Sequence, residues 1–313
     1  MARYITRRVL QALVVTLGIS VLVFMLVHLV PGDPIRVALG TRFDQATYDA
    51  LRERAGFNQP LIVQYFTWLG NAVQGDLGVS FRSGDPVTST ILGVLPATLT
   101  LAFASLVVAL VIAIPLGILS AVRSGSKLDY AATVFSQFGI SIPDFWMGIM
   151  LILLFSLTLG WLPSSGYTPL TEDPGDWLRH LVMPAVTVGV VSGSILTRFV
   201  RSSMLEALSQ DYTRTARSKG LHERVVVTRH VLKNAMIPVV TVTGLQLATL
   251  LGGVIIVEQV FSWPGLGRLA LIAVQRRDYP VLQGAVLVMA LTFLVINLVV
   301  DLLYAWLDPR IKY

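Results

Sequence analysis

The sequence predicts an all-α membrane protein with six transmembrane helices, and three observations support this fold class. Hydrophobic residues make up 54% of the 313 residues and charged residues only 13%, about half of the roughly 25% that soluble proteins carry. Six stretches without Asp, Glu, Lys or Arg approach or exceed the roughly 20 residues that a transmembrane helix needs. Basic residues are also distributed unequally between the two sides of the membrane. This composition excludes a soluble globular protein, intrinsic disorder and a coiled coil, and the absence of cysteine excludes a disulfide scaffold.

The first uncharged stretch, 9–32, predicts a membrane helix that follows a short N-terminal tail. It contains fifteen Val, Leu, Ile or Phe residues between 9 and 30, each of which favours insertion by roughly 0.3 to 0.6 kcal/mol. A secretory signal peptide is the competing interpretation, because Arg3, Arg7 and Arg8 precede the apolar run. The run is longer than a signal peptide's and has no small-residue cleavage site. We therefore assign 1–30 to the tail and the first transmembrane helix.

The segment 31–96 predicts a small folded element outside the membrane. It mixes five Arg with six Asp or Glu and contains Gly-Asp and Asp-Pro turn signals. Its aromatic run indicates a short helix at the membrane interface, where such rings are favoured; a packed loop without ligand contact is the alternative. The residues of this run are Tyr65, Phe66, Trp68 and Leu69.

The remaining chain, 97–313, is predicted to form the core of the protein. The second uncharged stretch, 86–122, is too long for one span, and Pro96 suggests that its membrane helix begins near Ala97. A cytoplasmic loop is expected over 200–233. The five predicted membrane helices of the core cover about 97–121, 144–162, 181–199, 235–257 and 279–305.

The basic residues predict that both termini are cytoplasmic. Six spans place the termini on one side, and that side carries fifteen Lys or Arg, eight of them between 198 and 233. The other side carries nine, but five of these lie in 31–96, which exceeds the short-loop range of the positive-inside rule. The rule therefore compares fifteen basic residues on the side of the termini with four on the other side. The net charge of +6 reflects this topology, and we expect no nucleic-acid partner.

No motif in the sequence indicates catalysis or a bound cofactor. There is no G-x-x-x-x-G-K-[ST] phosphate loop, so the chain should not hydrolyse ATP by itself. The four histidines lack H-E-x-x-H spacing, which makes a catalytic metal site unexpected. Residues 265–270 match G-x-G-x-x-A, but they follow Phe-Ser-Trp-Pro rather than a β-strand, so this match does not predict a dinucleotide site.

Few polar residues are expected at membrane depth. A secondary transporter usually places ionisable groups there, whereas Asp144, Glu258 and Asp301 lie near span ends. A G-x-x-x-G pattern at 189–193 permits close helix approach, within the chain or to a partner. Neutral side chains could line a translocation path, although interhelical hydrogen bonding is the more frequent use of a buried amide. These candidate pathway residues are Gln137, Gln246 and Asn297.

The cytoplasmic stretch 198–233 is predicted to form two helices separated by a glycine turn. Ser203 and Glu206 fit a capping box, which predicts a helix start at Ser203. Gly220 predicts a left-handed helix end, and a second helix is expected from Glu223. Four apolar residues fall at helical spacing and predict one apolar stripe. They are Leu205, Leu208, Tyr212 and Ala216.

Two interpretations of this loop remain open on the residues alone. A basic hairpin could bind anionic lipid headgroups, since each Lys or Arg contributes about 1 kcal/mol near the surface. A docking element for a cytoplasmic protein is equally consistent, because Leu208 and Tyr212 would otherwise lack an apolar partner.

Six motifs resemble those of a known family. Residues 206–221 contain D-Y-T-R-T-A-R-S-K-G-L, which resembles the cytoplasmic loop of permease subunits of binding-protein-dependent ABC importers, peptide branch. Five further motifs are similar to the first of the two dipeptide/oligopeptide permeases, the B-type subunit. They are V-P-G-D-P at 30–34, G-D-L-G-V-S at 75–80, S-I-P-D-F-W at 141–146, F-S-W-P-G-L-G at 261–267 and V-D-L-L-Y-A-W-L-D-P-R at 300–310.

The resemblance implies a type I ABC importer permease fold in the bacterial plasma membrane. It implies a second homologous permease, two cytoplasmic ATPase subunits and an external binding protein that delivers di- or oligopeptides. ATP and Mg²⁺ would bind the ATPase subunits, with no cofactor in this chain. The expected mechanism is alternating access driven by those subunits, within membrane lipid.

The resemblance also implies that the loop inserts as a coupling helix into a cleft of an ATPase subunit. The general permease pattern has Glu-Ala-Ala ahead of its glycine. Placing that glycine on Gly220 puts Arg214 and Thr215 at the Glu and first Ala positions, so no glutamate salt bridge can be transferred to Arg214. The residues assigned to ATPase coupling are Glu206, Leu208, Asp211, Tyr212, Arg214, Ala216, Arg217, Lys219, Gly220 and Leu221.

Three alternative functions are kept. Permeases of this branch resemble one another across substrates, so the cargo could be nickel, glutathione or another small solute. A stand-alone secondary transporter or channel is the alternative from a different class. An intramembrane hydrolase is a third, weakened by the absence of a G-x-G-D pair and of a Ser-His arrangement.

Overall fold

The computed structural model describes residues 2–29, 32–40, 43–54 and 56–307. Within these ranges the protein is helical, and the only β contact described is an isolated bridge between Val79 and Pro86. Five helices are long and apolar enough to cross a membrane, or up to six if a bent pair counts as one span. The protein is therefore a multi-pass membrane protein of the predicted all-α class.

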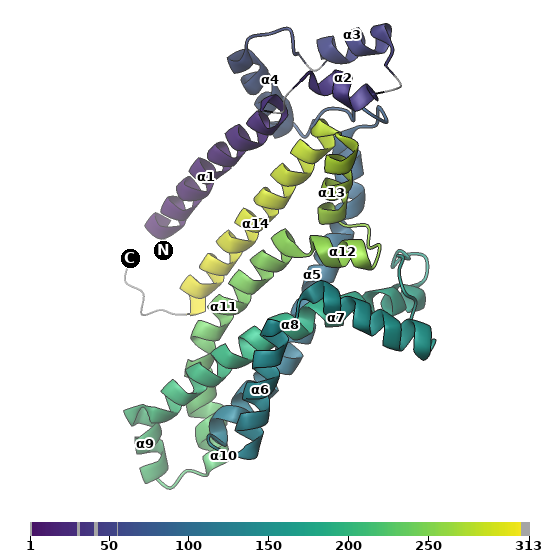
Figure 1. Cartoon of the computed structure of the whole chain (residues 1–313). Coiled ribbons are helices and arrows are strands. Elements are labelled where there is room, and N and C mark those ends of the chain that lie inside the picture. Colours follow the sequence, from purple (N-terminus) through teal and green to yellow (C-terminus); the bar gives the residue numbers. More distant parts are fainter. Residues whose placement is uncertain (1, 30–31, 41–42, 55, 308–313) are drawn as a thin grey trace.

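The long helices run side by side along the molecule (Figure 1). They are α1 (Ala2–His28), α5 (Val87–Val122), α8 (Pro174–Ser209), α11 (Leu232–Gly253) and α14 (Tyr279–Leu307). A bent pair consists of α6 (Lys127–Ser141) and α7 (Asp144–Leu151), which continues as the π-helix η2 (Ile152–Thr158). The two limbs of this pair meet at an angle of 101°.

Shorter helices lie at the two ends of the molecule and beside the long ones (Figure 1). At one end are α2 (Pro34–Leu39), α3 (Gln45–Arg54) and α4 (Leu61–Val73). At the other are α9 (Asp211–Ser218), α10 (Glu223–Val225) and the π-helix η3 (Val226–Val231). Between them, α12 (Ile255–Val260) and α13 (Leu266–Arg276) precede α14.

The second long helix begins ten residues before the start expected near Ala97. Helix α5 starts at Val87 and passes through Pro96. Val87 and Ile91 are almost fully buried, in a cluster that includes Leu266. This packing holds the first turns of α5 in helical conformation and outweighs the loss of one backbone donor at the proline.

The third and fifth spans also differ from expectation. The expected third span, 144–162, is only the second limb of a bent pair whose first limb, α6, was not predicted. The expected fifth span, 235–257, ends as a continuous helix at Gly253, and α12 is a separate element. Uncharged stretches locate apolar chain but do not reveal where a helix bends.

The centre of the fold is the close packing of α5 against α8. A Cβ atom added to Gly189 would lie 2.6 Å from the Val108 Cβ, and one added to Gly193 would lie 3.2 Å from the Ala109 Cα. The G-x-x-x-G pattern is thus used within this chain. Nearer the C-terminal end of α5, a Cβ atom added to Gly117 would lie 2.6 Å from the Val200 Cβ of α8.

The segment before α5 is organised around the carboxylate of Asp33. Asp33 caps α2 by accepting hydrogen bonds from the backbone N–H groups of Ile35 and Arg36, at 2.9 and 3.2 Å. It also accepts from the Tyr48 hydroxyl at 2.5 Å and pairs with the Arg52 guanidinium at 3.0 Å. Burial acts to raise the pKa of Asp33, but these hydrogen bonds and the Arg52 charge together hold it below its usual value.

Helix α4 is the short helix predicted from the aromatic run, and it packs on α1. The Tyr65 hydroxyl lies 2.8 Å from the Ser20 Oγ, and the His28 Nε2 lies 2.9 Å from the Gln64 Oε1. His28 is therefore a structural residue that joins two helices.

Candidate functional site

Helix α8, the third long helix, continues into the loop instead of ending before it. Helix α8 runs without interruption to Ser209, so the capping box predicted at Ser203 is wrong. The reason is packing: Val200, Met204 and Ala207 of α8 are buried in a cluster with Ala121 of α5. Burial of this face favours continued helix more than a local cap favours a new start.

Helix α9 follows after one extended residue, Gln210, and rests on the end of α8. Thr213 is fully buried, and its hydroxyl donates to the carbonyl oxygen of Ala207 at 2.8 Å. Ala216, one turn later, is also buried in the α8 cluster. These two side chains on one face fix the orientation of α9.

The opposite face of α9 is exposed, which divides the predicted apolar stripe. Leu205 and Leu208 lie on α8 and pack against the inner cluster, together with Ala216 of α9. Tyr212 does not join them and is 39% exposed. Arg214 on the same short helix is 74% exposed. The surface of α9 thus presents one aromatic ring among charged groups.

The turn after α9 is the predicted glycine turn. Gly220 has φ +74°, a left-handed conformation that side chains rarely adopt, and its N–H donates to the Arg217 carbonyl oxygen at 2.9 Å. Arg217 and Glu223 form a two-point ion pair across the turn, at 2.6 and 3.1 Å. The chain resumes helical structure at Glu223, also as predicted, with His222 as its cap.

The ten residues assigned to ATPase coupling therefore lie together, and eight of them are exposed. Leu208 of α8 is half-buried and Ala216 of α9 is buried, so both belong to the packed contact between the two helices. Figure 1 places α9 and α10 at the tip of the molecule, at the end opposite α2 and α3. We name the exposed surface formed by 211–221 the loop surface.

Behind the loop surface lies an ion pair that the sequence did not predict. Asp129, at the start of α6, and Arg201, on α8, make two hydrogen bonds of 2.7 and 2.9 Å. Ser120 of α5 donates to the same carboxylate at 2.5 Å, and the Gly125 N–H donates at 2.9 Å. Ser126, which caps α6, was the sequence signal that could have located this helix start.

The three candidate pathway residues lie in different surroundings. Gln137 is exposed on α6, one turn before the bend. The Gln246 amide donates to the Ser192 hydroxyl of α8 at 3.0 Å, the interhelical bond expected of a buried amide. Asn297 lines a groove between α1 and α14.

The G-x-G match at 265–270 surrounds a buried carboxylate. Glu258 accepts hydrogen bonds from the Thr98 hydroxyl and the Arg268 N–H, both at 2.8 Å. A Cβ atom on Gly265 would lie 1.9 Å from the Glu258 Oε1. The glycines make room for a side chain that caps α13, which explains the match without a dinucleotide. Across the described ranges, no three His, Asp or Glu side chains are grouped to hold a metal ion.

Comparison with protein families gives two matches that together cover nearly the whole chain. Residues 113–313 match the binding-protein-dependent transport system inner membrane component, and residues 1–102 match the N-terminal membrane component of such systems. The boundary falls within α5.

Curated relatives match over their full length. The chain is 44% identical to the oligopeptide transport system permease protein AppB of Bacillus subtilis, with 100% of both chains covered. It is also 44% identical to the glutathione transport system permease protein GsiC of Escherichia coli, again with 100% of both covered.

Solved structures share the fold at low sequence identity. A chain of the MetNI methionine ABC transporter, in an inward-facing crystal form, aligns with a TM-score of 0.55 at 20% identity, covering 70% of this chain and 96% of that one. A chain of an amino acid ABC transporter aligns with a TM-score of 0.52 at 17% identity, covering 72% and 95%. The long helices thus have the arrangement found in type I ABC importer permeases.

Proposed function

The chain belongs to the family of inner-membrane components of binding-protein-dependent transport systems, and we propose that it is one of two homologous permeases through which an importer moves short peptides. An external binding protein would deliver the cargo. Two cytoplasmic ATPase subunits would bind ATP and Mg²⁺, and this chain would have no ATPase site and no cofactor of its own. Both termini would be cytoplasmic.

The observation that carries the proposal is the loop surface. Helix α9 contacts α8 through Thr213 and Ala216, so its opposite face is free to contact a partner. The exposed surface around α9 carries the ring of Tyr212 on one flank and the guanidinium groups of Arg214 and Arg217 elsewhere around the helix. Aromatic and arginine side chains are enriched at protein interfaces, where they supply contact area and register. The arrangement favours docking to a protein over simple adsorption to headgroups.

The connection from the loop to the membrane helices supports the same proposal. The Asp129–Arg201 pair and the Ser120 hydroxyl join α5, α6 and α8, and α9 rests on the end of α8 through Thr213. A displacement of α9 would therefore move three helices together rather than bend one of them. Alternating access needs this kind of rigid shift between two states, which the ATPase subunits would stabilise differently.

We propose that the translocation pathway runs along the exposed face of α6 next to its bend with α7. Gln137 and Ser141 lie one turn apart there, and both are exposed in the isolated chain. Polar side chains at membrane depth face protein or water rather than lipid. This face would therefore meet the cavity or the second permease. Gln246 has its hydrogen-bond partner within the chain.

Short peptides are the substrate class that the relatives favour. Two full-length relatives are named as transporters of oligopeptides and of glutathione, and both cargoes carry amide bonds and a free carboxylate. Nickel or another small solute is the second candidate within the same importer class. A stand-alone secondary transporter or channel is the candidate from outside it.

Co-purification tests the proposal. Tagged wild-type chain and the double variant Tyr212→Asp, Gly220→Pro would be expressed with the neighbouring transport subunits and assayed for bound proteins and ATP hydrolysis. The wild type should retain a second permease and ATPase subunits, and the variant should retain the permease but lose the ATPases. Ala50→Asp, which changes an exposed residue of α3 at the opposite end of the molecule, is the control and should behave as wild type. If both chains purify alone and still move solute, the importer proposal fails.

A further inference from the structure

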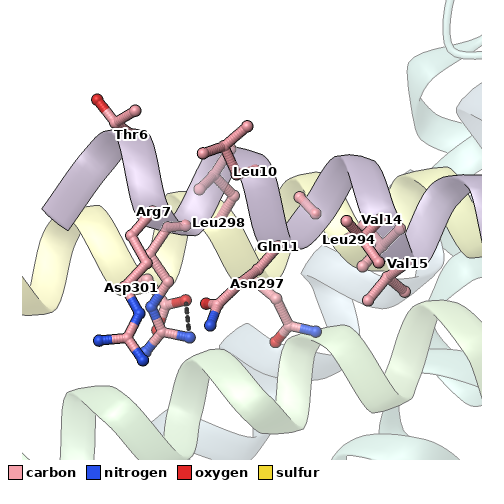
Figure 2. Close-up of a pocket in the computed structure, with 12 residues that line it drawn as sticks. Thr6, Arg7, Leu10, Gln11, Val14, Val15, Leu294, Asn297, Leu298 and Asp301 are labelled. Carbon is pink, nitrogen blue, oxygen red and sulfur yellow. Dashed lines mark ion pairs between the residues drawn. The ribbon is translucent and has the colours of Figure 1, made fainter. Parts of the chain in front are cut away.

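A long groove runs between α1 and α14 on the surface of the protein. It has a volume of about 1250 Å³ and is lined by side chains of these two helices only. Figure 2 shows α1 and α14 side by side, with the labelled side chains arranged along their length. The groove lies away from α9 and is separate from the loop surface.

One end of the groove is polar and carries a net positive charge. Figure 2 shows Arg7 projecting from α1 and Asp301 from α14, and Arg8 of α1 also lines the groove. The Arg8 Nη1 lies 3.2 Å from the Asp301 Oδ2. The three charged groups that line the groove therefore sum to one positive charge, and Arg7 adds a guanidinium beyond the pair.

One helical turn further along the groove, the lining side chains are uncharged hydrogen-bond donors. Gln11 follows Arg7 by one turn of α1, and Asn297 precedes Asp301 by one turn of α14. Figure 2 shows both amides on the side of the groove where the arginines project. Each amide supplies two N–H donors and one acceptor.

Beyond the amides the groove is apolar. Val14, Val15 and Leu294 line it about two turns from the arginines. Val14 is 69% exposed and Val15 46% exposed in the isolated chain. A charged end, an amide level and an apolar stretch thus follow one another in the order of a phospholipid's phosphate, glycerol esters and acyl chains.

We propose that this groove binds an anionic phospholipid of the cytoplasmic leaflet. The phosphate lies against Arg7 and Arg8, the ester carbonyl oxygens accept hydrogen bonds from Gln11 and Asn297, and the acyl chains follow Val14 and Leu294. The net positive charge favours an anionic over a zwitterionic headgroup. Arginine suits this role because its planar guanidinium donates two parallel hydrogen bonds to phosphate.

A membrane helix of another chain is the competing occupant, and the charges disfavour it. Such a helix would need a carboxylate level with Arg7 and hydrogen-bonding groups level with Gln11 and Asn297. A phospholipid supplies all three groups in one molecule. The inference is independent of the proposed substrate, because it depends only on α1, α14 and the orientation of the N-terminus.

Lipid retention tests the inference. The chain, co-expressed with its transport subunits, would be placed in nanodiscs of phosphatidylcholine with a minor fraction of phosphatidylglycerol, extracted into mild detergent and analysed by native mass spectrometry. Wild type should retain phosphatidylglycerol preferentially, and Arg7→Gln should reduce that retention at least about tenfold, because the phosphate loses its charge-assisted hydrogen bonds to Arg7. Arg123→Gln, which removes an exposed basic residue at the end of α5, is the matched control and should match wild type.

Crosslinking locates the bound molecule. Photoactivatable phosphatidylglycerol should label peptides containing 7–15 and 294–301 in wild type and label them weakly in Arg7→Gln. Because the chain has no cysteine, Leu298→Cys also permits a bifunctional thiol crosslinker to report a protein neighbour. Equal retention by Arg7→Gln and Arg123→Gln, equal retention of both lipids, or efficient crosslinking of Leu298→Cys to another chain would each overturn the inference.

Discussion

Arg201 of α8 and Asp129 of α6 are 72 residues apart and form a two-point ion pair, with Nε–Oδ1 and Nη2–Oδ2 distances of 2.7 and 2.9 Å. The side chain of Asp129 is 9% exposed and that of Arg201 is 32% exposed. The Ser120 hydroxyl, on a third helix, donates to the same carboxylate. This cluster joins α5, α6 and α8 through side chains of all three helices.

We predict that Arg201→Met destabilises the protein by about 2 to 3 kcal/mol. Removing one partner of a buried pair leaves an uncompensated charge, which costs about 3 to 5 kcal/mol when both groups are fully buried, and the partial exposure of Arg201 lowers that cost. Thermal unfolding of the purified protein measures the effect. Arg198→Met, three residues earlier on α8, is the control.

A double variant distinguishes an ion pair from simple packing. Arg201→Met combined with Asp129→Leu removes both charges, so it should recover much of the lost stability. The two side chains do not interact energetically if the loss of stability in the double variant equals the sum of the losses in Arg201→Met and in Asp129→Leu measured separately.

The second prediction concerns Gly265 and Glu258. A methyl group at Gly265 would lie 1.9 Å from the Glu258 Oε1, so Gly265→Ala must displace a buried carboxylate from its donors on Thr98 and Arg268. We expect a loss of at least about 3 kcal/mol, because overpacking typically costs about 1 to 3 kcal/mol and here a charged group also loses hydrogen bonds. The yield of monodisperse protein and its melting temperature report the loss.

Gly252→Ala is the matched control for this substitution. Gly252 is helical, and an added Cβ atom would meet nothing within 4 Å. Alanine is favoured over glycine in a helix by about 1 kcal/mol, so this variant should be as stable as wild type or more so. Similar melting temperatures for the two alanine variants would refute the structural role given to Glu258.

The apolar helices and the glycine turn could be predicted because their signals are local. Hydropathy located α1, α8, α11 and α14, and the left-handed turn at Gly220 needed only the residue type and its neighbours. The resemblance in 206–221 located the loop surface. Each of these features depends on residues that lie within about 20 positions of one another in the sequence.

The remaining features depend on contacts between distant residues. Ser203 fits a capping box, yet Met204 and Val200 are buried against α5 and keep the helix continuous. Helix α6 was missed because the uncharged run between Asp129 and Asp144 has only 14 residues, and only the partner Arg201 makes the Asp129 carboxylate acceptable at the start of this helix. No local pattern in the sequence reveals a partner 72 residues away.

The third prediction is a loss of order in 33–54 on acidification. The pKa of Asp33 is held below its usual value, so the folded state binds a proton less readily than the unfolded state. Its stabilising contribution is therefore complete above the unfolded pKa of about 4 and is lost as pH falls through the folded value. Hydrogen exchange, corrected for the intrinsic effect of pH, should show falling protection of α2 and α3 below about pH 4.

Asp33→Asn is the variant that isolates this carboxylate. It should lower protection at neutral pH and make protection less dependent on pH. The pKa of Asp44 is also lowered, by hydrogen bonds from Thr47, so some pH dependence should remain at the start of α3. An unchanged pH profile in Asp33→Asn would assign the whole effect to Asp44 and refute the role of Asp33.

The last prediction tests how α9 is held. Thr213→Val keeps the shape of the side chain but removes the hydroxyl that donates to the Ala207 carbonyl oxygen at 2.8 Å. The Ala207 carbonyl oxygen then keeps only the long bond from the Gln210 N–H, at 3.4 Å. Losing the shorter bond costs about 1 kcal/mol, and because α9 has only eight residues this cost affects the local docking of the helix rather than the whole protein. Hydrogen exchange of 211–218 should therefore accelerate at least about fivefold, while the melting temperature changes little. Thr215→Val is the matched control, since Thr215 is exposed and its hydroxyl bonds only within α9. If the loop surface couples to ATPase subunits, Thr213→Val should also weaken the stimulation of ATP hydrolysis by substrate, whereas Thr228→Val, at an exposed threonine outside the loop surface, should not. Faster exchange without a change in stimulation would keep the structural role of Thr213 and contradict the coupling role of α9.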